Sequence, residues 1–239
     1  MKKYLITAFA LLMAAGSARA QFSSSSSSYI GLHLGGNLGH QTVDTAYDNA
    51  TTGFKFGIIG GVQYDHWFND MVGIGIGLQF DQKGSSEAYS DGKIGNIVSN
   101  PDGSIKAKYV GSDDYAMSYL EIPITLKVSF GDGDVRPYIT AGPSIGMLLS
   151  ASETTTNNIP TVTNLKSYLN STDLSAYIGG GFLDHLPSGT LVEFELGYAA
   201  GLSKLYKSQP DRSPLPTPVQ HLTSTSGDIR MTLGLMWQI

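Results

Sequence analysis

Apolar and polar residues alternate with a period of two through the last twelve residues of the chain. Ile229, Leu233 and Trp237 share one parity, whereas Asp228 and Arg230 share the other. Because successive side chains of a strand point to opposite faces, this segment predicts a strand with one apolar and one polar face. Such a strand is typical of a wall between lipid and polar atoms.

Seven earlier segments follow the same rule, which predicts eight strands in all. In each of them apolar residues occupy one parity, while glycine, serine, threonine and scattered charges occupy the other. The predicted strands span approximately residues 30–38, 54–64, 72–81, 119–130, 136–149, 173–183, 192–202 and 228–239.

The connections between these segments alternate between short and long. Short turns are expected around residues 69–70, 131–134 and 186–189. Long polar loops are expected over residues 40–52, 84–114, 151–171 and 205–226. Short turns at one end and long loops at the other are the layout of an outer-membrane barrel. We therefore predict an all-β fold, an eight-stranded antiparallel up-and-down transmembrane β-barrel with short periplasmic turns and long extracellular loops.

The polar face decides which side of the predicted strands meets lipid. A soluble calyx around an apolar ligand would also show period two, but its polar face would meet water and be crowded with lysine and glutamate. Here small residues dominate that face, which favours a crowded interior. Aromatic residues also gather near the predicted short turns, as in the girdles of membrane barrels. These aromatic residues are Tyr64, Trp67, Phe68, Phe130 and Trp237.

The beginning of the chain predicts export. A basic start, an apolar stretch ending near Ala15 and a small-residue site at Ala20 predict that residues 1–20 form a signal peptide cleaved after Ala20. Residues 21–28 are expected to be a serine-rich flexible leader. Residues 29–239 then form the barrel domain.

Composition after the predicted cleavage site excludes several classes of function. That part holds 12 basic and 20 acidic residues, a formal net charge of −8, which disfavours a nucleic-acid partner. There is no cysteine, so no disulfide can form. We expect no metal and no cofactor, because the histidines are dispersed without metal-ligand spacing. They are His33, His40, His66, His185 and His221.

Charged residues on the polar face predict an ion network inside the barrel. Isolated buried charges would cost several kcal/mol each, so pairing is expected. We interpret the network as a plug that fixes strand register rather than as a gate. Its predicted members are Glu121, Lys127, Arg136, Glu193 and Glu195 toward the short turns, Lys55, Asp81 and Lys83 in a second cluster toward the loops, and Arg230 on the last strand.

The predicted interior is filled. Eight strands enclose a space that side chains can occupy, so a wide aqueous channel is not expected. Inward glycines thin the wall formed by the first three segments, and tyrosines from the opposite wall are expected to use that room. These tyrosines are Tyr115, Tyr119, Tyr138 and Tyr177.

Two neighbouring segments carry a family resemblance. Residues 119–127 (YLEIPITLK) and residues 136–146 (RPYITAGPSIG), separated by a Gly/Asp turn, resemble the most recognisable motif of the PorT-like outer membrane β-barrel family. Residues 31–37, 78–84 and 198–202 also resemble its pattern. The resemblance implies an eight-stranded barrel in the outer membrane of a Bacteroidetes-type bacterium, with no catalytic residues to transfer.

Three functions remain open from the sequence. The preferred hypothesis is a structural or surface-interaction barrel with a filled lumen and partner-binding extracellular loops, and the alternative is a narrow pore or transport-related barrel. A membrane-embedded hydrolase or acyltransferase is third, and we expect no enzyme. The polar residues that such an enzyme could use at the loop end are His40, Asp44, His221 and Asp228.

The expected partners follow from the predicted location. They are outer-membrane lipid and lipopolysaccharide, the barrel assembly machinery during biogenesis, and an unknown extracellular partner of the long loops, above all residues 84–114 and 205–226. The chain ends on Ile239, with Trp237 two positions earlier, whereas many barrels end on an aromatic residue that the assembly machinery recognises.

Overall fold

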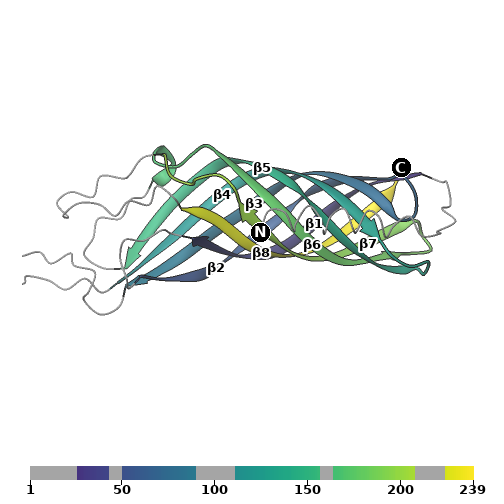
Figure 1. Ribbon diagram of the computed structural model, residues 1–239, viewed down its shortest axis with the longest axis horizontal. Helices are drawn as coiled ribbons and strands as arrows, with labels where there is room; N and C mark the ends of the chain where they lie inside the picture. The colour runs from purple at the N-terminus through teal and green to yellow at the C-terminus, as the bar shows by residue number, and fades with distance from the viewer. Residues whose placement is uncertain (1–25, 43–49, 90–110, 157–163, 208–223) are drawn as a thin grey trace, which may run out of the picture.

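The computed structural model describes residues 26–42, 50–89, 111–156, 164–207 and 224–239 (Figure 1). Eight antiparallel strands close into one barrel, in which each strand pairs with its neighbours in sequence and β8 pairs with β1. The strands are β1 (Ser27–Thr42), β2 (Ala50–Trp67), β3 (Val72–Tyr89), β4 (Gly111–Ser129), β5 (Val135–Thr156), β6 (Thr172–His185), β7 (Thr190–Gly201) and β8 (Thr225–Gln238). This topology confirms the predicted fold.

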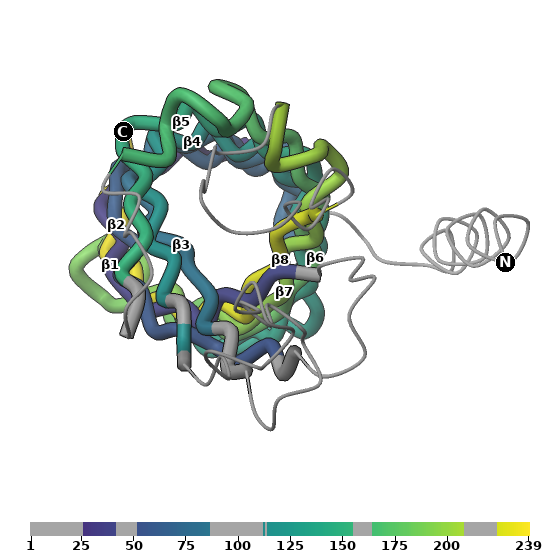
Figure 2. Tube along the Cα trace, turned by 90° about the vertical axis from the view of Figure 1, so that its left-hand side faces the viewer, coloured from purple at the N-terminus to yellow at the C-terminus, as the bar shows by residue number. Residues whose placement is uncertain are grey.

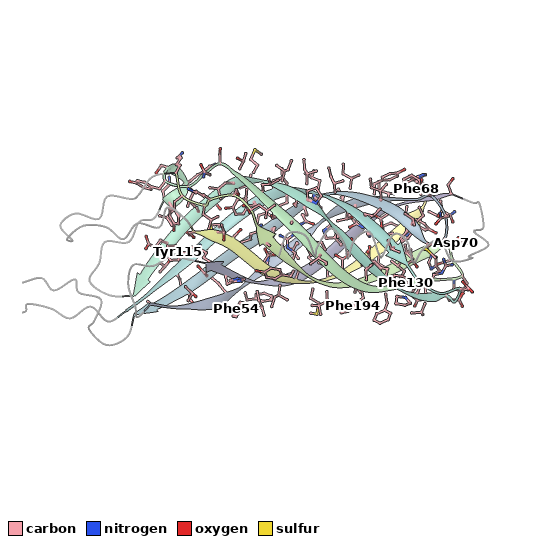
Figure 3. The ribbon with its side chains drawn as sticks, in the orientation of Figure 1. Phe54, Phe68, Asp70, Tyr115, Phe130 and Phe194 are labelled. Carbon is pink, nitrogen blue, oxygen red and sulfur yellow. The ribbon has the colours of Figure 1, made fainter. Side chains whose placement is uncertain are left out.

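The apolar parity points outward on all eight strands. Leu34 on β1 and Phe56 on β2 are 70% and 68% exposed, whereas the inward Asp81 on β3 is fully buried. Figure 3 shows side chains projecting outward along much of the barrel wall. In water this much exposed apolar surface would drive aggregation, but in a bilayer it contacts the lipid acyl chains.

The ring is closed by the first and last strands. β8 pairs with β1 from Tyr29 opposite Gln238 to Thr42 opposite Thr225. Viewed from the loop end, the strands form an unbroken ring (Figure 2). Closure leaves no edge strand, so the backbone polar groups of the wall pair within the protein instead of facing hydrocarbon.

Each short turn has its own local cause. The Asn69 side chain accepts hydrogen bonds from the backbone N–H groups of Met71 and Val72, at 2.9 and 2.8 Å, and so holds the β2–β3 turn. Gly131 in the β4–β5 turn and Gly189 in the β6–β7 turn have φ of +88° and +80°, a conformation that favours glycine. We call this end of the barrel the turn end and the opposite end the loop end.

The strands are longer at the loop end than the alternation predicts. β3 continues to Tyr89, β4 begins at Gly111 and β5 continues to Thr156, so parts of the predicted loops 84–114 and 151–171 are strand. The sequence signal stops earlier because a strand that rises above the lipid has no apolar face. β1 begins at Ser27, within the predicted leader, and the predicted signal peptide lies outside the described residues.

Within the ranges that the structure describes, one short helix is present, the 3₁₀ helix η1 (Leu165–Ser167). Among the described residues no helix is long and apolar enough to cross a membrane.

Candidate functional site

The barrel interior is built in four layers along its axis. From the loop end these are a loop-side apolar layer, a loop-side ion cluster, a turn-side ion cluster and a turn-side apolar layer. The loop-side ion cluster comprises Asp81, Lys83, Glu121, Asp173, Asp228 and Arg230. The turn-side ion cluster comprises Asp65, Lys127, Glu193 and Glu195.

Lys83 is one of the two cations in the loop-side ion cluster. Its Nζ lies 2.5 Å from Glu121 Oε1 and 3.2 Å from Asp173 Oδ2. Asp81 and Asp228 place carboxylate oxygens at 3.7 and 3.9 Å from the same nitrogen. The Lys83 ammonium group also lies 5.2 Å from the centre of the Tyr119 ring. Lys83 therefore joins carboxylates from β3, β4, β6 and β8.

Arg230 is the second cation and shares three of these four carboxylates, all but Asp173. It donates to Asp81 Oδ2 at 2.8 Å, contacts Glu121 Oε2 at 3.1 Å, and donates to Asp228 on its own strand. Asn37 on β1 donates from Nδ2 to Asp81 Oδ1 at 2.5 Å. Five strands thus meet through one cluster of buried charges.

The turn-side ion cluster has a single cation. Lys127 Nζ lies 2.7 Å from Asp65 Oδ2 and 2.5 Å from Glu193 Oε1. Its ammonium group also lies 5.5 Å from the centre of the Tyr138 ring. β4 is therefore held to β2 and to β7 through this one ammonium group.

Tyrosine hydroxyls complete the turn-side ion cluster. Tyr138 Oη lies 2.5 Å from Glu193 Oε1 and 2.6 Å from Glu195 Oε2, and Tyr177 donates to Glu195 Oε1 at 2.7 Å. A phenol has one hydrogen, so Tyr138 can donate to only one of its two partners. Glu193 and Glu195 of β7 therefore compete for a single phenol hydrogen.

Polar side chains connect the two ion clusters. Gln79 donates to Glu121 Oε2 at 3.1 Å and contacts His33 Nε2 at 3.1 Å through its own Oε1. The Tyr177 ring lies 5.8 Å from the Arg230 guanidinium. Between the clusters remains a cavity of about 50 Å³, lined among others by His33, Gln79, Arg230 and Glu195. A polar space of this size can hold a few water molecules but no larger solute.

The turn-side apolar layer closes the interior below the ions. It consists of Tyr29, Trp67, Tyr138, Leu183, Leu191 and Met236, all buried. The prediction that Trp67 belongs to an outer aromatic girdle is wrong, because Trp67 is 5% exposed whereas Phe68 is 53% exposed. Trp67 shares the inward parity of Asp65. Phe68 and Phe130 do lie on the outer surface at the turn end (Figure 3).

The loop-side apolar layer closes the interior above the ions. The wall contributes Tyr115, Met117, Tyr119, Leu148 and Ala151, and two loop segments contribute Leu165, Leu169, Leu205 and Tyr206. Figure 3 places Tyr115 at the loop end. A register shift between Ser118 and Tyr119 leaves Leu149 of β5 without an opposite residue, so Leu148 and Ala151 both face inward.

The two loop segments form one unit, residues 164–170 with residues 202–207, which we call the loop cap. Asn170 N–H donates to Leu205 O at 2.7 Å, and Lys207 N–H donates to Tyr168 O at 3.0 Å. Ser203 donates to Asp173 Oδ1 at 2.7 Å, which joins the loop cap to the loop-side ion cluster. The alternation pattern missed this unit because its leucines lie within predicted loops and pack against distant strands.

Two predicted members of the ion network lie elsewhere. Arg136 is at the turn end, where it donates to the backbone oxygens of Gly133 and Asp70 at 3.0 and 3.3 Å. Its parity is inward, but it stands beyond the filled part of the interior. Lys55 is partly exposed beside Gly84 and forms no ion pair with the described residues.

The remaining predicted members are redistributed between the clusters. Lys127, Glu193 and Glu195 meet near the turn end, whereas Glu121, expected with them, joins Asp81, Lys83 and Arg230 in the loop-side ion cluster. Three participants were not predicted as members: Asp65, Asp173 and Asp228. Asp65 has the inward parity of its strand, so its place in the interior network could have been predicted from the sequence.

Of the four residues considered for catalysis, the two that the structure describes lie on opposite faces of the wall. His40 lies against Phe54 and Tyr198, two exposed aromatic residues of the outer wall, with ring centres at 5.4 and 6.0 Å. Asp228 is buried in the lumen against Arg230. Asp44 and His221 lie outside the described residues. Among the described residues no group of three His, Cys, Asp or Glu has the geometry of a metal site.

The sequence matches the profile of a family described as outer membrane protein beta-barrel domain over residues 19–207. The chain belongs to this family. The closed ring of strands, the apolar outer face and the family together identify an outer-membrane barrel. A search of curated protein sequences finds no match.

Solved structures of several outer-membrane barrels are similar to this member of the family. Neisserial surface protein A shares 11% identity at a TM-score of 0.44, with 88% of this chain and 98% of that chain covered. OprG from Pseudomonas aeruginosa shares 11% identity at 0.43, with 92% and 99% covered. The outer membrane protease OmpT from Escherichia coli shares 11% identity at 0.43, with 93% and 99% covered. Similarity at this level carries no information about function.

Proposed function

We propose that this protein is a non-conducting, non-enzymatic outer-membrane scaffold that presents its loop end to partners at the cell surface. The observation that carries the proposal is the four-layered interior. Ion pairs cross the lumen at two heights, and apolar side chains fill it above and below them. With the lumen filled, the loop end is the part of the protein that can contact partners at the cell surface.

The interior offers a solute little room. A passing ion would have to displace Lys83, Lys127 or Arg230 from their carboxylates, and breaking a buried pair costs about 3 to 5 kcal/mol. The cavity between the clusters is about 50 Å³ and holds a few water molecules. A larger cavity of about 190 Å³, lined by Trp67, Arg136 and others, lies at the turn end below the turn-side apolar layer.

Planar-bilayer conductance of the refolded protein tests this proposal. We expect no stable unitary openings, while a general-diffusion porin refolded and inserted in the same way serves as positive control. Discrete, reproducible openings of the wild-type barrel would contradict the scaffold and support a pore.

A narrow cation path is the second candidate, favoured by the composition of the interior. Seven carboxyl groups of the two ion clusters surround only three cationic side chains. Such an acidic excess would attract cations. If openings are found, their reversal potential in a KCl gradient decides the matter, because this candidate requires cation selectivity.

The branch of the family, the type of bacterium and the route of export are also proposals. The resemblance of residues 119–127 and 136–146 supports membership of the PorT-like branch, in a bacterium of the Bacteroidetes type. We further propose export through a signal peptide cleaved after Ala20, insertion by the barrel assembly machinery, and contact with lipopolysaccharide. Amino-terminal sequencing of the protein from an outer-membrane fraction should begin at Gln21, and any other start would contradict the cleavage site.

A further inference from the structure

The loop cap carries three lysines and no acidic residue. Lys166 lies on the first segment, and Lys204 and Lys207 lie on the second, and all three side chains are exposed. The surrounding chain is acidic, with a formal net charge of −8 after residue 20. The loop cap is thus a positive surface on a negative protein.

Lys166 and Lys204 lie close to outward apolar residues of the wall. Lys166 donates from Nζ to the backbone oxygen of Leu149 at 2.9 Å, and Leu149 is an outward apolar residue at the loop end of β5. Leu202, which is 61% exposed, donates from its N–H to Leu174 O of β6 at 2.7 Å and stands two residues before Lys204. The loop cap therefore sets the Lys166 ammonium group beside the outward Leu149, and places Lys204 two residues after the outward Leu202.

The lysines are held on a fixed support. Leu165, Leu169 and Leu205 are buried in the loop-side apolar layer, and backbone hydrogen bonds join the two segments. A rigid support reduces the conformational entropy that a ligand must overcome. Lys166 uses one of its three N–H donors on Leu149, so two remain for a ligand.

We infer that the loop cap binds the phosphate groups of lipid A in the outer leaflet. The inference rests on the proposed orientation, in which the loop end faces outward. Ammonium groups form charge-assisted hydrogen bonds with phosphate, and the outward Leu149 and Leu202 contact the acyl chains of the same lipid. A soluble anion would contact the lysines alone, whereas a phosphorylated glycolipid contacts both the lysines and the outward apolar side chains beside them.

Native mass spectrometry of the refolded full chain in neutral detergent tests the inference. The probes are diphosphoryl lipid A and the same lipid without its phosphates. The wild type should prefer the diphosphoryl form, and the K166Q/K204Q/K207Q variant should bind it on the order of 100-fold more weakly at low salt, since each lysine contributes roughly fivefold. Added salt should reduce the difference.

Two matched variants control the result. K166R/K204R/K207R keeps the charges and should bind like the wild type, and K55Q removes a lysine from the loop end outside the loop cap and should also bind like the wild type. Equal wild-type affinity for the two lipids, an unchanged glutamine variant, or an arginine variant as weak as the glutamine one would overturn the inference.

Two further measurements, heat-modifiable migration on gels and planar-bilayer conductance, distinguish a failure of the lipid A inference from a failure of the proposed function. Each variant should migrate in a heat-modifiable way on gels, because the three lysines are exposed. A folded, non-conducting barrel without phosphate preference refutes the lipid A site and leaves the scaffold intact. Conductance refutes the scaffold whatever the lipid result.

Discussion

The two ion clusters stabilise the same barrel by different chemistry. The loop-side ion cluster sets two cations among four carboxylates, whereas the turn-side ion cluster has one cation for three carboxyl groups and adds two tyrosine hydroxyls. Where cations are scarce, phenol groups supply the hydrogens that buried carboxyl oxygens need. The turn-side ion cluster therefore depends on a single cation, whereas three of the four loop-side carboxylates, all but Asp173, lie within ion-pair distance of both Lys83 and Arg230.

Removing the single cation should have the largest effect. Lys127→Met leaves Asp65 and Glu193 buried without their partner, so we expect a loss of about 3 to 5 kcal/mol in the free energy of unfolding. Urea-induced unfolding of the refolded barrel in lipid vesicles measures it.

A compensated variant controls for the change in shape. K127M/D65N/E193Q removes the unpaired charges together with the lysine and should recover part of the loss. A triple variant less stable than Lys127→Met would show that charge is not the origin of the effect.

Removing one cation of two should cost less. In Lys83→Met the guanidinium of Arg230 still contacts Asp81 and Glu121, and we expect a loss of about 2 to 3 kcal/mol in the same urea titration. If Lys83→Met is as destabilising as Lys127→Met, the loop-side ion cluster has no redundancy.

Removing one hydroxyl should have a smaller effect again. Tyr138→Phe keeps the ring in the turn-side apolar layer but takes away the hydroxyl shared by Glu193 and Glu195, for an expected loss of about 1 to 2 kcal/mol. Tyr177→Phe, which deletes a contact to Glu195 alone, is the matched comparison. No change in either variant would mean that the hydroxyls are dispensable to the turn-side ion cluster.

Charged residues outside both clusters should matter least. Lys55→Gln and Arg136→Gln should each shift the free energy of unfolding by less than about 0.5 kcal/mol, since neither residue forms an ion pair with the described residues. A large loss in either variant, in the same vesicles, would place that residue in the stabilising network after all.

The sequence was sufficient to predict which residues face into the barrel, but not at which height along the barrel axis each inward residue lies. Parity alone placed Lys127, Glu193 and Arg230 inside, because a strand has only two faces. It could not place Glu121 at the right height, since depth depends on how far each tilted strand is staggered against the next. In the structure Glu121 pairs with Gln79 of β3, close to Asp81 and Lys83.

The loop cap was beyond sequence reasoning for a different reason. Leu165 and Leu205 lie about forty residues apart and pack against wall residues such as Tyr115, and no local periodicity records such a contact. Arg136 shows the converse error, because its parity was right but the filled interior ends before it. The local alternation shows on which face of a strand a residue lies, whereas the closed barrel determines which inward residues are in contact.

Arg230 has a consequence for how the barrel matures. It stands on β8, the strand that closes the barrel against β1, yet it contacts carboxylates of β3 and β4. Until β8 arrives, Asp81 and Glu121 have Lys83 alone as cationic neighbour in the loop-side ion cluster. Pairing of β8 with β1 therefore also brings Arg230 to the buried carboxylates of the lumen. The electrostatic energy of these new ion pairs favours closure of the barrel.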